Sequence, residues 1–409
     1  MKTNYSITFI SLIVICSFSN AQSLDDYLKI ATKNSPHLQS IHYNYESDLE
    51  KINELGSIQN TSIGVGYFVS PVETRVGAQK AKFSISQNLP WFGTLNTKQE
   101  GAALKANATL NEFDMAKRTL FLQIKTTYYQ LYELKSKENI ITEHLKLLTS
   151  FEELALSELE NNRSTMVDVL KIRIEKNELT NSLNTIQENF KAKQITFNLL
   201  LNRNKNSEIT ITKNISINTS EAIFSKEAIS TNPKLLQLQN LKASLKKEEL
   251  ATKKEGLPTV GIGLDYVIVE ERPAPNIADN GKDIFMPMVS VSIPLFSNKY
   301  RSKQKQFQLD QKAIVATSIN TTNELTTLFE TSESAIKTAR TSILTQTQNI
   351  AETERIKTLL LAAYETSSID FKQLLEIQQM KLKFEFKKVG SEKEYAIQKS
   401  TLEFLTTTN

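Results

Sequence analysis

Cysteine is almost absent from this chain of 409 residues, whose only copy is Cys16. Cys16 lies in an N-terminal segment in which an apolar stretch, Ile7 to Ile15, is followed by small residues ending at Ala21. This pattern predicts a signal peptide over residues 1–21 that is removed on export. Lipid attachment at Cys16 is disfavoured, because the residue before it is the bulky Ile15. The exported chain would then have no cysteine, which excludes disulfides and thiolate metal sites.

Long apolar runs and a dominant charge are also missing. No stretch beyond the N-terminal segment approaches the roughly 20 apolar residues that a membrane-spanning helix needs. The chain has 49 Lys and Arg against 45 Asp and Glu, a net charge of +4. Such a balance lacks the excess of basic residues that is typical of nucleic-acid-binding proteins, so no nucleic-acid partner is predicted.

Catalytic and metal-binding motifs are absent too. The chain has no phosphate-binding glycine loop, no His-Glu-x-x-His and no serine in a nucleophile elbow. Its three histidines, His37, His42 and His144, lack the spacing of metal ligands, and we interpret them as ordinary helix-surface residues. The prediction is a non-enzymatic protein with no cofactor and no metal.

Proline and glycine are confined to parts of the chain. All nine prolines lie between Pro36 and Pro90 or between Pro233 and Pro294, and no glycine occurs between Gly101 and Gly256. Because both residues interrupt helices, the chain alternates between two broken windows and two long uninterrupted stretches.

The uninterrupted stretches predict long helices over about 97–159 and 298–364. Apolar residues recur every seven positions in the first, which is typical of a coiled-coil seam: Phe113, Leu120, Thr127, Leu134, Ile141, Leu148 and Ala155. The second has a weaker seam through Leu328, Ala335, Ile356 and Ala363. Short polar turns, 161–165 and 366–370, lead into second helices, so both stretches predict helical hairpins.

The broken windows predict strands at about 58–70, 80–90, 258–270 and 284–294, because apolar and polar residues alternate there with a period of two. The windows also repeat each other. Pro36 and Gly64 precede Pro233 and Gly261 by 197 residues, and the segments that end in Pro90-Trp91-Phe92 and Pro294-Leu295-Phe296 are 204 apart. One insertion between the second pair of strands explains the difference. We therefore predict two copies of one unit, 22–202 and 221–409, joined by a linker at 203–220.

Four amphipathic strands are too few to close a membrane barrel, which needs about eight. Open strand edges cannot lie in lipid, because their backbone groups would be unpaired. Strands of this kind can enter a membrane only if several chains share one barrel, and three chains would supply twelve.

The duplicated order, the Asn34-Ser35-Pro36 and Thr231-Asn232-Pro233 helix starts and the two strand-to-helix segments resemble the TolC-like outer membrane factor family. The resemblance implies a mainly α-helical fold with a small β part, in which three chains form a twelve-stranded transmembrane barrel and a periplasmic helical barrel. It implies an outer-membrane exit duct that serves efflux or type I secretion. The implied partners are two further copies, outer-membrane lipid, a periplasmic adaptor and an inner-membrane resistance-nodulation-division (RND) or ABC transporter. The Leu-Pro-Trp-Phe-Gly segment is most similar to members paired with heavy-metal RND pumps.

The resemblance also assigns candidate residues. The periplasmic tip would carry Arg163, Asp168, Ser367, Ser368 and Asp370. Asp370 has two interpretations that can hold together, a helix N-cap and one of a ring of three carboxylates at the gate, and Asp168 has the same two. At the strand–helix junctions, four apolar residues would either anchor the barrel at the lipid headgroups or cap the join between strand and helix: Trp91, Phe92, Leu295 and Phe296. Pro90 and Pro294 would set the bend from strand into helix.

Two other classes of protein remain open at this point. One is a periplasmic adaptor, which also has a helical hairpin. The other is a soluble periplasmic coiled-coil scaffold, in which the strand pairs would be short additions to the helices. The two hairpins and the alternating apolar strand faces favour the duct.

Overall fold

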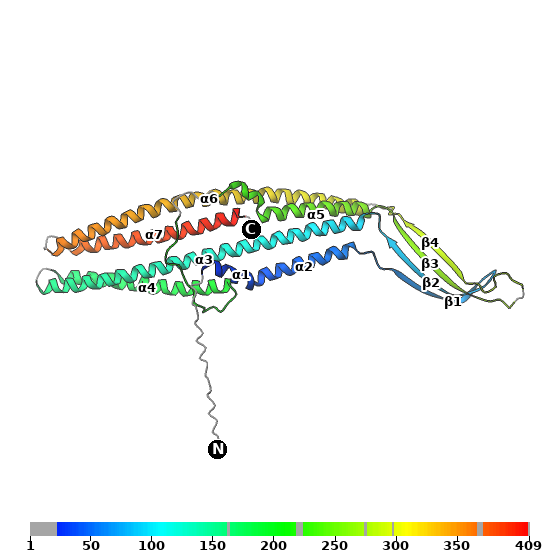
Figure 1. Cartoon of the computed structure of the whole chain (residues 1–409), viewed down its shortest axis with the longest axis horizontal. Helices are drawn as coiled ribbons and strands as arrows, with labels where there is room; N and C mark the ends of the chain where they lie inside the picture. The colour runs from blue at the N-terminus through cyan, green and yellow to red at the C-terminus, as the bar shows by residue number, and fades with distance from the viewer. Residues whose placement is uncertain are drawn as a thin grey trace, which may run out of the picture.

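The protein is elongated, with a four-stranded sheet at one end and the ends of two pairs of long helices at the other (Figure 1). The computed structural model describes residues 23–161, 164–217, 224–273, 276–296, 298–365 and 371–407. The predicted signal peptide and Cys16 lie outside these ranges.

The same order of elements occurs twice along the chain. The first half contains α1 (Leu24–Asn34), α2 (Pro36–Gly56), β1 (Ser62–Thr74), β2 (Gly77–Leu89), α3 (Thr94–Glu160) and α4 (Met166–Leu200). The second half contains η1 (Lys226–Thr231), α5 (Pro233–Glu255), β3 (Thr259–Glu270), β4 (Ile284–Ser292), α6 (Asn298–Glu365) and α7 (Phe371–Thr406).

Both α2 and α5 begin with a polar cap and a proline. The Ser35 hydroxyl accepts from the backbone N–H of Leu38 at 3.3 Å. The Asn232 side chain accepts from the backbone N–H of Lys234 at 3.0 Å. In each case proline follows at the first helical position, where its missing N–H costs no hydrogen bond.

The four strands form one antiparallel sheet in the order β1-β2-β3-β4. The pairing of β2 with β3 joins the two halves of the chain. Each strand leads into or out of a helix, and α2 packs on α3, α3 on α5 and α5 on α6. The lateral order of these helices therefore repeats the order of the strands, so that sheet and helices form one continuous layer.

The ends of β1, β2 and β4 differ from the predicted ends, because strand pairing decides where a strand begins and ends. β1 begins at Ser62, four residues later than expected, because Ser62 is the first residue of β1 with a partner in the ladder, Ser86. Pairing continues to Thr74 and Gly77, so β1 and β2 extend into most of the gap between the predicted strands at 58–70 and 80–90. β4 ends at Ser292, before Pro294, which has no N–H to donate to a ladder.

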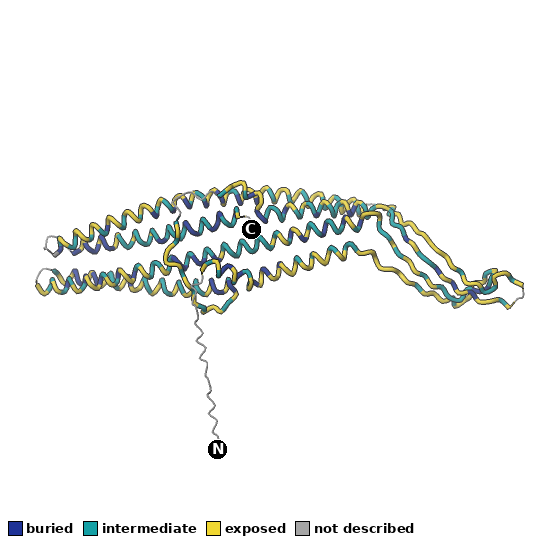
Figure 2. Tube along the Cα trace, in the orientation of Figure 1, coloured by how far each residue is buried: buried dark blue, intermediate teal, exposed yellow. Residues whose placement is uncertain are grey.

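The helix α3 has the predicted coiled-coil seam. Ile141, Leu148 and Ala155 are fully or almost fully buried, and the other seam residues are buried or half-buried. The hairpin partner α4 and the second-half helix α7 both pack on α3. Buried residues gather in this helical part, whereas the strands are largely half-buried or exposed (Figure 2).

The predicted seam of α6 is wrong. Leu328 and Ile356 are exposed, and the buried row is Leu325, Phe329, Ser332, Ile336, Ala339 and Ile343. This row also repeats with helical spacing and packs against α7 and η1. The Ser- and Thr-rich composition of α6 weakens the apolar signal that separates one face from the next.

The packing of α3 predicts a stability effect. Leu131 is fully buried among Tyr27, Tyr128 and Phe197, whereas Leu359 on α6 is largely exposed. Leu131→Ala should lower the free energy of unfolding by about 2–5 kcal/mol, because a buried cavity is created. Leu359→Ala should change it by less than about 0.5 kcal/mol. Thermal unfolding followed by circular dichroism compares the two variants; equal midpoints would contradict this packing.

Candidate functional site

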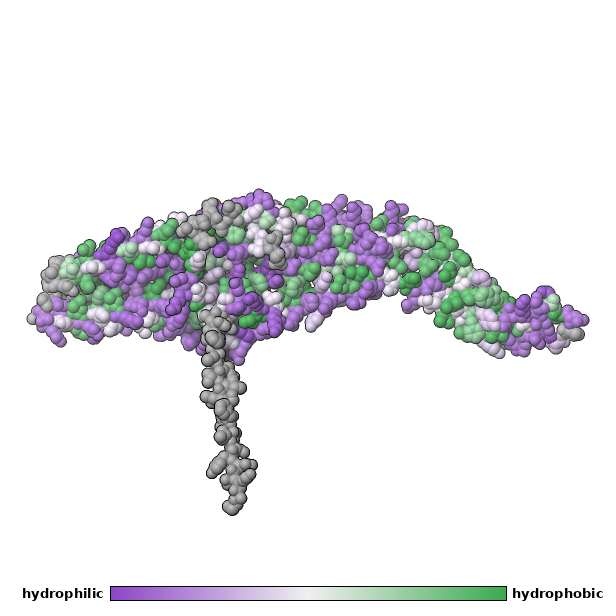
Figure 3. Space-filling view, viewed as in Figure 1, coloured by the Kyte–Doolittle hydropathy of each residue, from purple (hydrophilic) through white to green (hydrophobic). Residues whose placement is uncertain are grey.

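One face of the sheet is apolar across all four strands and is open to the surroundings. The register aligns Val65, Phe83, Tyr266 and Phe285 in one row. These side chains are 71%, 43%, 41% and 66% exposed, although they are aromatic or branched. A second row contains Ile63, Ile85, Leu264 and Pro287. Apolar surface covers much of the strand region, and polar surface returns at its outer end (Figure 3). A contiguous exposed patch of this kind marks contact with another apolar phase or partner.

The opposite face of the sheet carries the polar side chains, although Val267, Met286 and Met288 also lie on it. The register aligns Gly64, Ser84, Asp265 and Met286 in one row. Asp265 is fully buried, and its carboxylate lies 2.5 Å from the ammonium group of Lys82. Because an unpaired buried charge is strongly unfavourable, the contact with Lys82 compensates the burial of Asp265 on this face.

Both edges of the sheet are open in the single chain, and each edge strand carries a proline. Pro71 lies in β1, where the register shifts between Tyr67 and Val72, and Pro287 lies in β4. Proline is tolerated at a sheet edge because its missing N–H removes no bond within the existing ladder. The other backbone groups along these edges can still pair with further strands.

The strand–helix junctions expose large apolar side chains. Phe92, Leu295 and Phe296 are 84%, 83% and 91% exposed, and the Trp91 ring packs edge-on against Phe92 at 6.1 Å between centroids. Pro90, from the junction of the first copy, and Pro294, from the junction of the second, line the same cavity.

A left-handed residue begins α3. Gly93 has a φ of 72°, a conformation that strains other residues. Its carbonyl oxygen accepts from the Lys254 ammonium group at 3.0 Å, and the Thr97 hydroxyl oxygen accepts from the same group at 2.8 Å. The C-terminal end of α5 is thereby held against the first turn of α3.

Of the predicted tip residues, only Asp168 lies in the part of the chain that the structure describes. It completes a capping box: the Thr165 hydroxyl donates to its carboxylate at 2.7 Å, and Lys171 lies 3.7 Å away. Asp168 therefore has the capping role, and a place in a ring of carboxylates stays a prediction. Arg163, Ser367, Ser368 and Asp370 fall outside the described residues.

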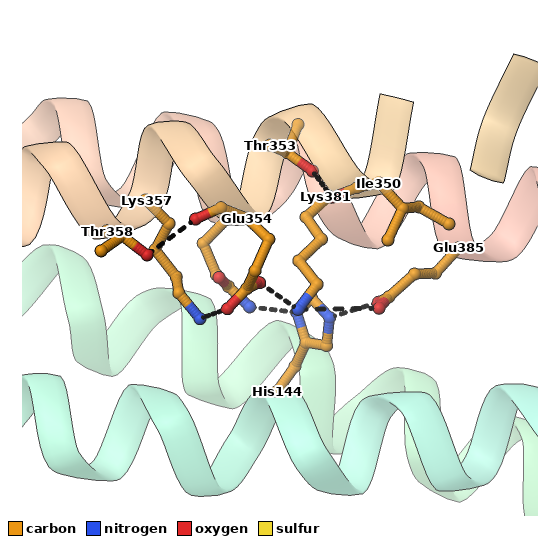
Figure 4. Close-up of polar contacts among 9 residues, drawn as sticks. His144, Ile350, Thr353, Glu354, Lys357, Thr358, Lys381 and Glu385 are labelled. Carbon is orange, nitrogen blue, oxygen red and sulfur yellow. Dashed lines mark hydrogen bonds and ion pairs between the residues drawn. The ribbon is translucent and has the colours of Figure 1, made fainter. Parts of the chain in front are cut away.

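The two hairpins meet through a buried histidine that the sequence analysis missed. His144 on α3 is 5% exposed, so its assignment to the helix surface is wrong. Its Nε2 lies 2.6 Å from a carboxylate oxygen of Glu385, and its Nδ1 lies 2.8 Å from the amide nitrogen of Gln378, both on α7 (Figure 4). With the Gln378 amide donating to Nδ1, the Nε2–H donates to Glu385. A histidine with both nitrogens engaged fixes the rotation of α3 against α7.

A charged cluster adjoins this histidine. The Lys381 ammonium group lies 3.8 Å from Glu385 and 2.7 Å from Glu354, which comes from α6 (Figure 4). Glu354 also pairs with Lys357, and these lysines lower the pKa of its carboxyl. The chain of contacts therefore runs from α3 through α7 to α6.

Further polar contacts continue along α3 and α7. Tyr132 donates to Glu392 at 2.8 Å, and burial together with that carboxylate raises the pKa of the tyrosine. Lys125 donates to Glu403 at 2.6 Å. Glu133 pairs with Lys393 at 3.0 Å. We call the contacts made by Lys125, Tyr132, Glu133 and His144 the polar ladder.

Other kinds of site are not found in the described part of the chain. No group of three or more His, Cys, Asp or Glu side chains there could hold a metal ion. No described helix is both long enough and apolar enough to cross a membrane.

Solved structures with this architecture are channels of the outer membrane. VceC, an outer membrane protein of Vibrio cholerae, superimposes with a TM-score of 0.76 at 13% identity, over 94% of this chain and 95% of that one. The CmeC outer membrane channel of Campylobacter jejuni gives 0.73 at 13%, over 94% and 85%. CusC, described as forming a transmembrane channel, gives 0.77 at 11%, over 94% and 92%. This chain has the fold of outer-membrane channels. No family profile and no curated protein sequence matches it.

The polar ladder predicts a sharp difference between two histidines. His144→Ala should destabilise the protein by about 1–3 kcal/mol, because Glu385 and Gln378 would lose their buried partner. His42→Ala removes an exposed pair with Glu46 and should change stability by less than about 1 kcal/mol. Thermal unfolding measures both. Replacing His144, Gln378 and Glu385 together by leucine should recover much of the loss, and failure to do so would contradict a loss that arises from unpaired polar groups.

Proposed function

We propose that this protein is a passive outer-membrane exit duct of a tripartite efflux or type I secretion system. The observation that carries the proposal is the exposed apolar face that crosses all four strands, on a sheet whose two edges are open. The fold likeness to outer-membrane channels supports the same conclusion.

The duct is a trimer. Four strands cannot close a barrel, and unpaired edge groups in lipid are each unfavourable by several kcal/mol. When β4 of one copy pairs with β1 of the next, three copies close a barrel of twelve strands, within the range of outer-membrane barrels. The apolar face then contacts lipid, and the polar face that carries Lys82 and Asp265 lines the pore.

The helices continue the barrel as a tube into the periplasm. Because the helix layer keeps the strand order, twelve strands lead into twelve helix segments around the same axis. The two units, 22–202 and 221–409, supply similar halves of each protomer. The hairpin turns near 161–165 and 366–370 form the periplasmic tip, with Asp370 and Arg163 at the closed end.

Opening follows docking of a periplasmic adaptor and an inner-membrane RND or ABC transporter at this tip. The duct itself performs no reaction, and the pump selects the substrate; a heavy-metal RND pump is the pairing that the Leu-Pro-Trp-Phe-Gly junction favours. A soluble periplasmic scaffold or adaptor is the alternative. It would leave the apolar sheet face in water, which is unfavourable in proportion to its area.

Reconstitution tests the proposal directly. The full chain, extracted from outer membranes in detergent, should sediment as a trimer and produce conductance steps in planar bilayers. A monomer recovered from the soluble periplasmic fraction would refute the duct and favour the scaffold.

Adjacent residues of β4 provide a matched test of the two sheet faces. Val289 is 76% exposed on the apolar face, and its neighbour Ser290 is exposed on the polar face. Val289→Lys should destabilise insertion by about 2–4 kcal/mol if it lies near the bilayer centre, whereas Ser290→Lys, facing the pore, should be tolerated. Urea titration of folding into lipid vesicles measures the difference. Equal effects would contradict the assignment of the faces.

The tip carboxylate gives a separate prediction. If Asp370 contributes to a ring of three charges at the closed end, Asp370→Ala should raise the closed-state conductance and weaken its dependence on divalent cations. Asp168→Ala should leave both unchanged, because Asp168 is held in its capping box. Single-channel recordings in graded calcium compare them, and an unaltered Asp370→Ala channel would leave that residue only a capping role.

A further inference from the structure

The two helices at the sides of the layer carry opposite charge. α2 packs on α3 and α6 packs on α5, so each has an outward side directed away from the rest of the layer. The acidic edge consists of Glu46, Glu50 and Glu54 on α2. The basic edge consists of Lys299, Arg301, Lys303, Lys305 and Lys312 at the start of α6.

The acidic edge lies opposite the buried side of its helix. Glu46, Glu50 and Glu54 are four residues apart and exposed, whereas the buried Leu38 and Ile41 lie on the side of α2 that faces α3. Their charge is only partly compensated within the chain. Glu54 pairs with Lys51 at 2.7 Å, Glu46 lies 3.3 Å from the His42 ring, and Glu50 accepts from the side-chain amide of Asn53.

The basic edge is less compensated still. Its five cations accompany a single acid in the first fifteen residues of α6, Asp310. None of the five forms a close ion pair with another described residue. Lys303 acts electrostatically on Glu248 of α5, and Lys299 and Lys303 lie over the rings of Tyr300 and Phe307. The first turn of α6 has no acidic residue, so these cations lie unfavourably against the positive end of the helix dipole. A partner with negative charge would compensate this arrangement.

Both helices join the sheet through connections of equal length. Five residues separate the end of α2 from β1, and five separate the end of β4 from α6. β1 and β4 are the two open strands. Any arrangement that brings β4 of one copy beside β1 of the next also brings the basic edge beside an acidic edge. Exposed apolar residues accompany both: Tyr43 on α2 and Leu309 on α6.

We propose that the basic edge of one copy docks on the acidic edge of the next, and that this charged contact, just below the barrel, selects the neighbour and the direction of assembly. The occupant of each edge is therefore a second copy of this chain. The contact is head-to-tail, the type that closes into rings, and opposite charge steers association and excludes like edges from meeting. The inference rests on the proposed trimeric duct and adds the interaction that aligns its subunits.

Charge reversal tests the contact in the full chain. The variant Lys299→Glu/Arg301→Glu/Lys305→Glu should reduce the trimer fraction in mild detergent at least tenfold at low salt, as should Glu46→Lys/Glu50→Lys/Glu54→Lys. Combining all six changes should restore trimer, because the edges are again complementary. Lys146→Glu/Lys191→Glu, on exposed sites elsewhere, is the matched control and should assemble normally. Circular dichroism checks that each variant keeps its helices.

The outcomes separate this contact from the duct itself. Unmodified protein that is monomeric overturns the proposed function. Unmodified trimer with no loss in either triple variant overturns the charged contact alone. Loss that the combined variant does not recover overturns it as well. A basic-edge variant that assembles normally but loses binding to phosphatidylglycerol vesicles would identify anionic lipid headgroups, not a second copy, as the occupant.

Discussion

The antiparallel pairing of β2 with β3 is the interaction on which the rest of the structure depends. It joins two halves of the chain that are far apart in sequence, and its register places Phe83 beside Tyr266 and Ser84 beside Asp265. One face becomes apolar over the full width of the sheet, and the other collects the polar residues of β2 and β3, because a strand alternates its side chains and this register keeps the alternation in phase. Since every strand runs into a helix, the same pairing also sets which helices are neighbours.

The helical part is held by two kinds of contact with different consequences. Apolar packing around Ile141, Phe151 and Phe371 supplies most of the stabilisation near the hairpin turns, and it is tolerant of small rotations. The polar ladder between α3 and α7 is directional, because His144 must present one nitrogen to Glu385 and the other to Gln378. Such contacts favour one rotation of the hairpins over others even where their net contribution to stability is small.

The edges of the layer combine two features that discourage indiscriminate strand pairing. Pro71 and Pro287 interrupt the edge strands, and clusters of like charge flank them on α2 and α6. Prolines and charges discourage indiscriminate pairing of strand edges. These features still allow the acidic edge of one copy to meet the basic edge of another, which is the contact that we propose.

The types and extents of the elements could be predicted from the sequence because they depend on local periodicity and local caps. The absence of proline and glycine between Gly101 and Pro233 predicted α3 to within three residues at its start and one at its end, and Pro36 and Pro233 marked the starts of α2 and α5. Period-two alternation located the strands, with errors where pairing, a long-range property, decided the ends.

Only the tertiary structure decided which side of each element faces which partner. The buried row of α6 differed from the predicted one because serine and threonine occur on several of its faces. His144 gave no local signal, since its partners lie 241 and 234 residues away along the chain. The sequence by itself therefore determined the helices, the strands and their amphipathic faces. The order of the layer, the polar ladder and the opposition of the two charged edges arose only when the β2–β3 pairing brought the two halves together.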